Sequence, residues 1–282
     1  MLIAQISDLH IAEAGTWLDQ GVDTAGHLQR AVAHLNALSP RPDLLIISGD
    51  LVDRRQPAEY QRLAALLAPL ELPFFLMVGN HDHRDRLRAA FPGHDYLGRE
   101  GFVQYCLDDL GPLRLIALDT MIPGQGGGEL CSERLAWLAT RLDEQPERPT
   151  VLFMHHPPFR TGLSFMDESR VVDGAEELAR LIAAHGHVEH VLCGHLHRPI
   201  SRRFAGTIAS TVPATAHQMG LNLKGTRDLS AVMDPPAVTL HYWQDAEAGL
   251  VTHLSYIGTA PSQTLFDGEN WIRDLKPLPA RV

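Results

Sequence analysis

Seven polar side chains of the sequence come directly after short hydrophobic runs, and they are of the types that bind metal ions. Imidazole nitrogens together with carboxylate and amide oxygens suit Mn, Fe, Zn or Co. No cysteine is among them, which excludes a structural zinc finger. Each residue alone is more often structural than functional, but five hydrophobic runs that end in this way indicate a shared metal site. The candidates are Asp8, His10, Asp50, Asn80, His155, His195 and His197.

The number of candidate ligands indicates two ions rather than one. Seven ligands are too many for one tetrahedral ion and suit a pair that shares a carboxylate, for which Asp50 is the candidate. Two divalent ions roughly 3.5–4 Å apart clamp the attacking and leaving oxygens of an in-line displacement at phosphorus. With Asp8, Asp50 and a bound hydroxide the site keeps a small positive charge, which attracts an anionic phosphate ester. The sequence therefore predicts hydrolysis of a phosphate ester by a metal-bound hydroxide.

Buried strands must deliver these side chains. The runs that precede them show no alternation of apolar and polar residues, which is typical of strands covered on both faces. Ligands of open α/β sheets bind at the carboxyl ends of the strands, so we expect the seven side chains to meet along one sheet edge. The runs are residues 2–7, 43–48, 74–78, 150–154 and 188–193.

Two pairs of candidates are separated by a single residue. If the chain is extended there, Asp8 and His10 point the same way, and so do His195 and His197. The alternative for the first pair is that Asp8 caps a turn and His10 is merely exposed.

Amphipathic helices are predicted between the strands, because apolar residues recur at intervals of three and four. Strands that alternate with helices indicate the α/β class. After residue 200 the pattern changes to hairpin-like strands. The predicted helices are residues 24–38, 58–70, 84–90, 132–143 and 175–184, and the further strands are 102–107, 113–119, 200–204, 207–212, 237–243 and 251–257.

Composition limits the classes of partner and the compartment. The chain has 282 residues and a net charge of −10, which argues against a nucleic-acid polymer or an anionic membrane as partner. Its three cysteines, Cys106, Cys131 and Cys193, form no CxxC pair and are typical of buried residues in a reducing compartment. The chain enters a strand at once, and no apolar run has the length of a membrane span. We therefore expect a cytoplasmic protein.

Five sequence blocks together resemble the calcineurin-like metallophosphoesterases, over residues 1 to about 200. The resemblance implies a four-layer α/β/β/α sandwich with two divalent metal ions in its cleft. We expect a core over residues 1–220, and a C-terminal β-hairpin extension over 221–282 that completes the fold. The blocks are Asp8-Leu9-His10, Gly49-Asp50, Gly79-Asn80-His81-Asp82, His155-His156-Pro157-Pro158 and Gly194-His195-Leu196-His197.

The resemblance also implies a role for each residue. Asp8, His10 and His197 hold one metal, Asn80, His155 and His195 hold the other, and Asp50 is shared.

His81, which follows Asn80, is not assigned as a ligand of either metal. His81 resembles the family's histidine that lies over the phosphate and stabilises or protonates the leaving oxygen, so the catalytic set is Asp50, Asn80 and His81. His156 is placed beside the ligands rather than among them. Asp82 either orients His81 or starts the following helix.

Two departures from the pattern of protein phosphatases indicate a branch of the superfamily. Arg55 stands where they carry the glycine of Gly-Asp-x-Val-Asp-Arg-Gly, and Asp82 where they carry glutamate. The chain looks more like the bacterial class III phosphodiesterases, which implies a 3′,5′-cyclic nucleotide such as cAMP, or a glycerophosphodiester, as substrate. Thr215-Ala216-His217-Gln218 resembles a segment near the substrate pocket of that branch. Asn80, His81 and His217 are then substrate contacts, with a surface histidine as the alternative for His217.

Other functions remain open at this point. A phosphomonoesterase or a broad-specificity phosphatase of the same fold is the nearest alternative, whereas the acidic surface disfavours a nuclease. A binding scaffold without catalysis is more remote, because no ligand is missing from the set. The resemblance also implies a homo-oligomer, a dimer or larger, formed through the C-terminal hairpins.

Overall fold

The computed structural model describes residues 1–258, 260–273 and 275–278. Its first sheet has five strands in the order β15-β14-β1-β2-β3. Strands β1, β2 and β3 are parallel, with β3 at the edge of the sheet. Strand β14 runs antiparallel to β1, and β15 runs antiparallel to β14. The C-terminal hairpin therefore lies in the same sheet as the first strand of the chain. The bounds are β1 Leu2–Ile6, β2 Leu44–Ser48, β3 Phe74–Met77, β14 Ala237–Trp243 and β15 Leu250–Tyr256.

The second sheet has six strands in the order β10-β11-β9-β7-β5-β4. Strands β5, β7, β9 and β11 are parallel, and the edge strands β4 and β10 run antiparallel to their neighbours. Two sheets, rather than one, thus provide the strand ends. The bounds are β4 Tyr105–Leu107, β5 Arg114–Leu118, β7 Thr150–Met154, β9 Val188–Cys193, β10 Ile200–Phe204 and β11 Thr207–Thr211.

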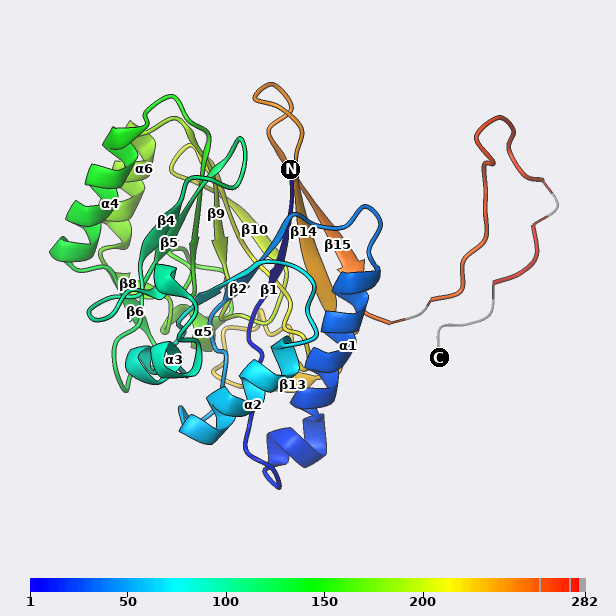
Figure 1. Ribbon diagram of the computed structural model, residues 1–282, viewed down its shortest axis with the longest axis horizontal. Coiled ribbons are helices and arrows are strands. Elements are labelled where there is room, and N and C mark those ends of the chain that lie inside the picture. Colours follow the sequence, from blue (N-terminus) through cyan, green and yellow to red (C-terminus); the bar gives the residue numbers. More distant parts are fainter. Residues whose placement is uncertain (259, 274, 279–282) are drawn as a thin grey trace.

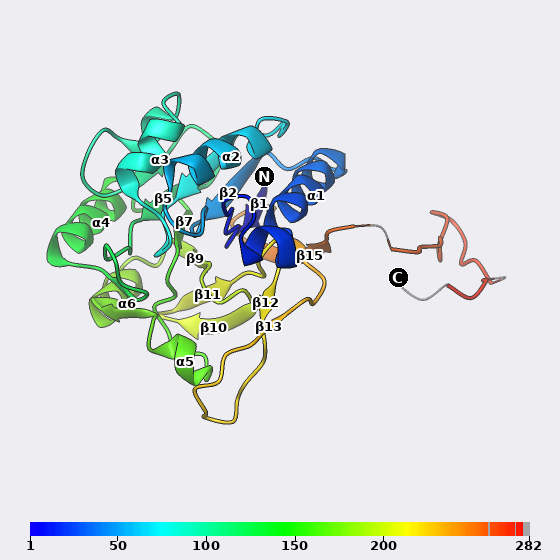
Figure 2. The same ribbon diagram turned by 90° about the horizontal axis from the view of Figure 1, so that it is seen from below.

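Helices cover the outer faces of the two sheets. In Figure 1, α4 and α6 lie on one side of the strands and α1 on the other, and Figure 2 shows α1 and α2 over β1 and β2. This arrangement is the predicted four-layer α/β/β/α sandwich. The bounds are α1 Thr24–Ala37, α2 Pro57–Leu67, α3 Arg84–Ala90, α4 Ser132–Glu144, α5 Ser164–Asp167 and α6 Ala175–Ala184.

Strand β7 shows why the apolar runs do not alternate. Val151 and Phe153 pack into the core between the sheets, whereas Leu152 and Met154 pack with Leu138 of α4 in a second core. All these side chains are fully buried, because successive residues of a strand point to opposite faces and both faces are covered.

The differences from the predicted elements lie at ends and in short segments. The helix predicted over 58–70 ends at Leu67, shortly before Pro69, which lacks the amide hydrogen that a further turn needs. The strand predicted over 102–107 begins at Tyr105. The remaining elements are too short to show a hydrophobic period. They are η1 Leu18–Val22, a π-helical turn, η2 Asp95–Leu97, and the strands β6 Gly128–Glu129, β8 Val171–Asp173, β12 Gln218–Met219 and β13 Ala231–Val232.

Candidate metal centre

All seven candidate ligands follow the carboxyl ends of strands. The ends of β1, β2 and β3 belong to the first sheet and those of β7 and β9 to the second, so the meeting point is an edge of the sandwich and not of one sheet. Each of the seven residues is at most 8% exposed. The structure brings them into mutual contact, with ligand atoms of several subsets within 4.8 Å of one another.

Most of these residues have left-handed backbone conformations. The φ angles are 55° for Asp8, 43° for His10, 49° for Asp50, 70° for His195 and 47° for His197. The expected extended pairs are therefore wrong, because the strands end before these residues. A non-glycine residue in this region costs on the order of 1–3 kcal/mol and persists only where its surroundings fix it. Such strain is common at active sites.

Two glycines of the motifs allow the strand ends to approach closely. A Cβ at Gly49, whose φ is 96°, would lie 2.5 Å from Nδ1 of His155. A Cβ at Gly79 would lie 2.2 Å from Oδ1 of Asp50. Since real contacts of this kind are never so short, any side chain at these positions would displace a candidate ligand.

Main-chain hydrogen bonds tie the loops together. The amide of Asp8 donates to the carbonyl of Gly49 at 3.0 Å, and that of His10 donates to the carbonyl of Asp50 at 3.0 Å. The amide of His195 donates to both carboxylate oxygens of Asp8, at 3.1 and 3.0 Å. The last contact joins the second sheet to the first through a candidate ligand.

One cluster contains Asp8, His10 and His197. Nε2 of His10 lies 3.1 Å from Nε2 of His197, which in turn lies 3.4 Å from Oδ1 of Asp8. Nδ1 of His197 lies 3.0 Å from the carbonyl oxygen of His217, which can only accept, so Nδ1 carries the proton. The lone pair of Nε2 is therefore directed into the cluster, as in histidines that bind metals.

The second cluster is centred on His155. Its Nε2 lies 3.1 Å from Oδ1 of Asn80 and 3.3 Å from Oδ2 of Asp50. Its Nδ1 donates to the carbonyl oxygen of Ser48 at 2.8 Å, so the neutral ring, which is the form that binds a metal, carries its lone pair on Nε2. The ring is thus oriented by the end of β2, the strand that also delivers Asp50.

Two further histidines lie against His155. The ring of His195 is 5.1 Å from it, and Nε2 of His195 lies 2.9 Å from Oγ of Ser169, which leaves Nδ1 for a cation. His156 is held through Nδ1, 2.8 Å from Oγ1 of Thr120, and its buried Nε2 has no hydrogen-bond partner in the described part of the chain. That His156 lies beside the ligands rather than among them stays a prediction.

Asp50 lies between the two clusters. Its Oδ2 is 3.7 Å from Nε2 of His10 and 3.3 Å from Nε2 of His155. A single carboxylate oxygen therefore faces an imidazole of each cluster. This is the placement that a shared ligand of two cations needs, and the mixed nitrogen and oxygen donors fit divalent transition metals.

The charges of the site favour a cation. Burial raises the pKa of Asp8, but His197 and His155 outweigh it and lower that pKa to about 2. Burial lowers the pKa of His155, yet Asp50 and Asp8 outweigh it and raise it to about 9. Burial lowers the pKa of His195 to about 3. Asp8 is therefore ionised, His195 is neutral, and positive charge is stabilised beside Asp50.

His81 lies over the edge of this site. Its Nδ1 donates to the main-chain oxygen of Asp53 at 2.8 Å, and its amide donates to Oδ1 of Asp50 at 2.8 Å. Its side chain is 38% exposed, unlike the buried ligands. The Asp53 carboxylate lies 3.7 Å from Nδ1 of His81 and 3.9 Å from Nδ1 of His10. The Asp53 carboxylate also lies 3.5 Å from Nε of Arg54.

His217 is brought to the site by the chain after β11. Its ring lies 4.8 Å from that of His197 and 5.8 Å from that of His10, and the residue is 7% exposed. The alternative of a surface histidine is therefore wrong. Burial lowers the pKa of His217 to about 4, so the ring is neutral at pH 7.

Asp82 was expected either to orient His81 or to start the following helix, and its hydrogen bonds indicate a different role. It accepts hydrogen bonds from the amides of Gly79 and Leu51 and from the hydroxyl of Tyr60, at 2.8, 3.1 and 3.1 Å. Helix α3 begins after it, with His83 at the N-cap. The buried carboxylate therefore braces the loops that follow β2 and β3.

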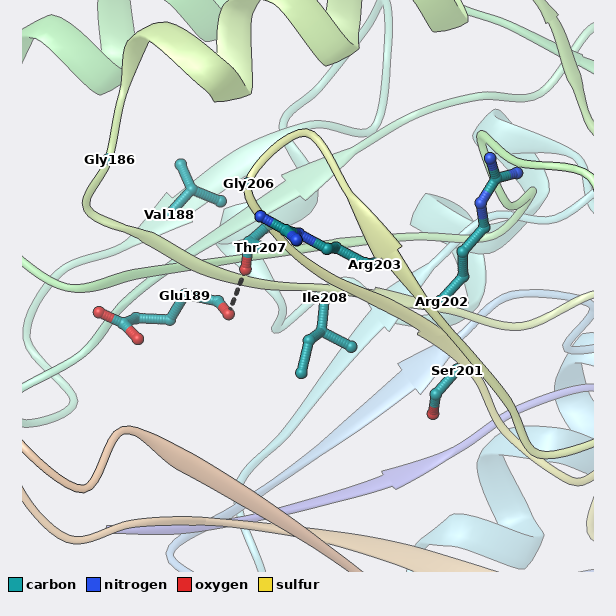
Figure 3. Close-up of a pocket in the computed structure, with 9 residues that line it drawn as sticks. All are labelled: Gly186, Val188, Glu189, Ser201, Arg202, Arg203, Gly206, Thr207 and Ile208. Atoms are coloured by element: carbon teal, nitrogen blue, oxygen red, sulfur yellow. Dashed lines mark hydrogen bonds between the residues drawn. The ribbon is translucent and has the colours of Figure 1, made fainter.

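Two cavities lie near the second sheet. One of about 720 Å³ is lined by Glu189, Arg203 and Thr207 among others, and Figure 3 shows it beside the β10–β11 hairpin, with none of the candidate ligands in its wall. Another, of about 270 Å³, is lined by His197 and by Tyr256 of β15. Only the second touches the candidate metal centre.

Comparisons with known proteins agree with this geometry. A probable glycerophosphodiester phosphodiesterase GpdQ of Arcobacter nitrofigilis is 36% identical over 258 residues, which are 92% of this chain and 94% of the relative. A probable cyclic nucleotide phosphodiesterase of Rhodopseudomonas palustris is 33% identical over 270 residues, 95% of this chain and 97% of the relative.

The fold is similar to that of a solved structure, and the part of the chain that carries the motifs matches a protein family. A dimetal phosphatase from Danio rerio superposes with a TM-score of 0.62 at 13% identity, over 92% of this chain and 99% of the other. At that identity the likeness concerns the fold alone. The calcineurin-like phosphoesterase family matches residues 1–199, the part that carries all the candidate ligands. The chain therefore belongs to the calcineurin-like phosphoesterase family.

Proposed function

We propose that the protein is a metal-dependent phosphodiesterase that hydrolyses a small phosphodiester, either a 3′,5′-cyclic nucleotide such as cAMP or a glycerophosphodiester. The observation that carries the proposal is the position of Asp50 Oδ2 between His10 and His155, which suits a pair of cations. The names of the two relatives, one for each substrate class, support the choice of diesters.

The donor set divides between two ions. One is assigned to Asp8, His10 and His197, and the other to Asn80, His155 and His195, with Asp50 shared. Fe, Mn, Zn and Co all suit these ligands. When bound, such ions activate water and neutralise charge at phosphorus.

The chain's own residues orient the substrate. His81 is fixed through Nδ1 by Asp53, which leaves Nε2 to hydrogen-bond or protonate the leaving oxygen. Asn80 and His217 are assigned to the walls that contact the phosphoryl group and its substituents. The neutral ring of His217 can accept or donate one hydrogen bond without adding charge.

The site is proposed to work in the cytoplasm on a free small molecule. The net charge of −10 disfavours nucleic-acid polymers and anionic membranes. None of the helices in the described ranges is long and apolar enough to cross a membrane.

The division into a core of residues 1–220 and an extension of 221–282 is likewise a proposal, as is a homo-oligomer. Residues 260–273, which follow β15, lie away from the body in Figures 1 and 2. It carries Trp271, which is 73% exposed, and Phe266, which is 47% exposed. Exposed apolar groups of this size favour contact with another subunit.

The test is a substrate panel with one metal-loaded preparation. cAMP, glycerophosphoethanolamine and an aryl phosphomonoester are compared, after elemental analysis of the metal content per chain. We expect close to two ions per chain and faster turnover of a diester than of the monoester. Faster turnover of the monoester would replace the proposal with a phosphatase. Absence of metal uptake by the folded protein would remove it.

A further inference from the structure

We propose that Trp17 is a stacking platform for a planar ring of the substrate, so that this site prefers a nucleotide diester. The inference rests on the proposed function and specifies its substrate class. It concerns residues 11–23, which lie between His10 and α1 and include no candidate ligand.

Trp17 lies at the rim of the metal centre. It stands directly before η1, and its ring centroid is 6.5 Å from that of His217, at an interplanar angle of 70°. His217 in turn touches the rings of His197 and His10. A group joined through a sugar to a phosphoryl group at the metal centre can therefore reach the indole.

The indole lies against the backbone of η1 although it is largely exposed. The residue is 65% exposed, which leaves a large apolar ring in water without the benefit of burial. A Cβ at Gly21 would lie 2.9 Å from Nε1 and 3.0 Å from Cδ1 of this indole. The ring thus lies against the η1 backbone at Gly21, where only glycine leaves room for it. The rest of the ring surface is exposed to solvent.

A planar ring fits this surface better than a cation. Recognition of ammonium groups uses several aromatic faces or a nearby negative charge. The adjacent carboxylate, Asp19, already pairs with Arg62 at 2.7 Å and accepts a hydrogen bond from Gly15. A nucleobase needs only one flat aromatic partner, and such stacking changes affinity by roughly 5- to 150-fold.

The decisive experiment compares ligands that differ only in the planar ring. Binding of adenosine 5′-monophosphate and of ribose 5-phosphate is measured by calorimetry on the metal-loaded wild type and on Trp17→Ala. We expect the wild type to bind the adenosine compound more tightly. Trp17→Ala should weaken that binding by roughly 5- to 150-fold and change ribose 5-phosphate binding by less than about twofold. Equal binding of both compounds by the wild type would overturn the proposal.

Kinetics separate stacking from a structural role. Trp17→Ala should raise the KM for cAMP far more than that for glycerophosphoethanolamine, and Trp17→Phe should restore most of the loss. Gly21→Ala, which displaces the indole without removing it, should raise the KM for cAMP as well. Trp271→Ala is the control, since it removes another exposed indole, one that follows β15 in the chain and has no candidate ligand beside it in the sequence.

The remaining outcomes are also decisive. Equal effects of Trp17→Ala on both diesters would mean a structural role, and a selective effect on glycerophosphocholine would mean recognition of an ammonium group. Either overturns the stacking proposal. If the wild type hydrolyses no diester, the proposed function fails, but the two binding measurements still decide whether Trp17 stacks on a base.

Discussion

The guanidinium of Arg55 donates a 2.6 Å hydrogen bond to the main-chain carbonyl of Asn80. The contact joins the loop after β2 to the loop after β3. Arg55 has a φ of 65°, a left-handed conformation that suits glycine, and glycine is the residue found there in protein phosphatases. An arginine that tolerates this backbone therefore contributes through its side chain, by fixing the peptide that carries a candidate ligand.

Arg55→Gly should lower kcat/KM by about 10- to 100-fold, the range seen when a group that orients a metal ligand is removed. Folding should change little, because the relieved backbone strain offsets the lost hydrogen bond. Metal titration and denaturant unfolding check both parts. Arg54→Ala, which removes a neighbouring exposed cation, should alter kcat/KM by less than about twofold, and an equal loss in the two variants would contradict this role.

Asn80→Ala and His195→Ala should each lose metal and hydrolysis together. Both residues are assigned to the same ion, and truncation of either leaves too few donors to hold it. Elemental analysis of the purified variants should show about one ion per chain where the wild type has about two. Full activity with either change would refute the assignment of the second metal.

His81→Ala should keep both ions and turn over slowly, by a factor of about 10² to 10⁴. The ring contacts the loop through Asp53 and is far more exposed than the ligands, so its loss leaves the donor set intact. Metal content and kcat are measured on the same preparation. Loss of an ion in this variant would show that His81 is a ligand.

Stability should fall in acid because of two buried histidines between the sheets. Nε2 of His190 lies 2.8 Å from Oγ of Ser210, and Nε2 of His241 lies 3.0 Å from Oε1 of Gln5. Burial lowers the pKa of His190 to about 4 and that of His241 well below its usual value. The unfolded chain binds protons near pH 6.5 whereas the folded chain does not, so acid favours unfolding.

The contribution of His190 to the free energy of unfolding should therefore be constant above pH 7 and fall between pH 6.5 and 4, by up to about 3 kcal/mol. Urea unfolding at pH 7.5, 5.5 and 4.5 measures the change. His190→Gln should flatten the dependence, and His253→Gln on the exposed strand β15 should not. An unchanged slope in His190→Gln would assign the acid sensitivity to other groups.

Local patterns predicted the strands well, and the structure brings the candidate ligands close together. Unbroken apolar runs such as residues 150–154 are explained by two cores, one on each face of β7. The convergence of the motif residues followed from strand ends, because carboxyl ends of parallel strands share an edge. That edge spans two sheets, however, and no short-range pattern shows which strands pair.

The supporting residues could not be predicted in the same way. Asp53 orients His81 through a main-chain oxygen, which any residue type possesses. Trp17 reaches His217 across 200 positions of sequence, and a lone tryptophan in a loop has no periodic signal. The left-handed conformations of Asp8 and His10 arise from tertiary hydrogen bonds to the loop after β2. Each of these features depends on distant parts of the chain.

The pairing of β1 with β14 has a consequence for biosynthesis. Leu2 lies opposite Tyr242, and the amino group of Met1 donates to the carbonyl of Trp243 at 2.9 Å. Strand β1 must therefore wait for a partner that is translated more than two hundred codons later. Until then the side of β1 that pairs with β14 is open to chaperones or to another nascent chain. A chain truncated before β14 would therefore have a sheet with an unpaired edge strand.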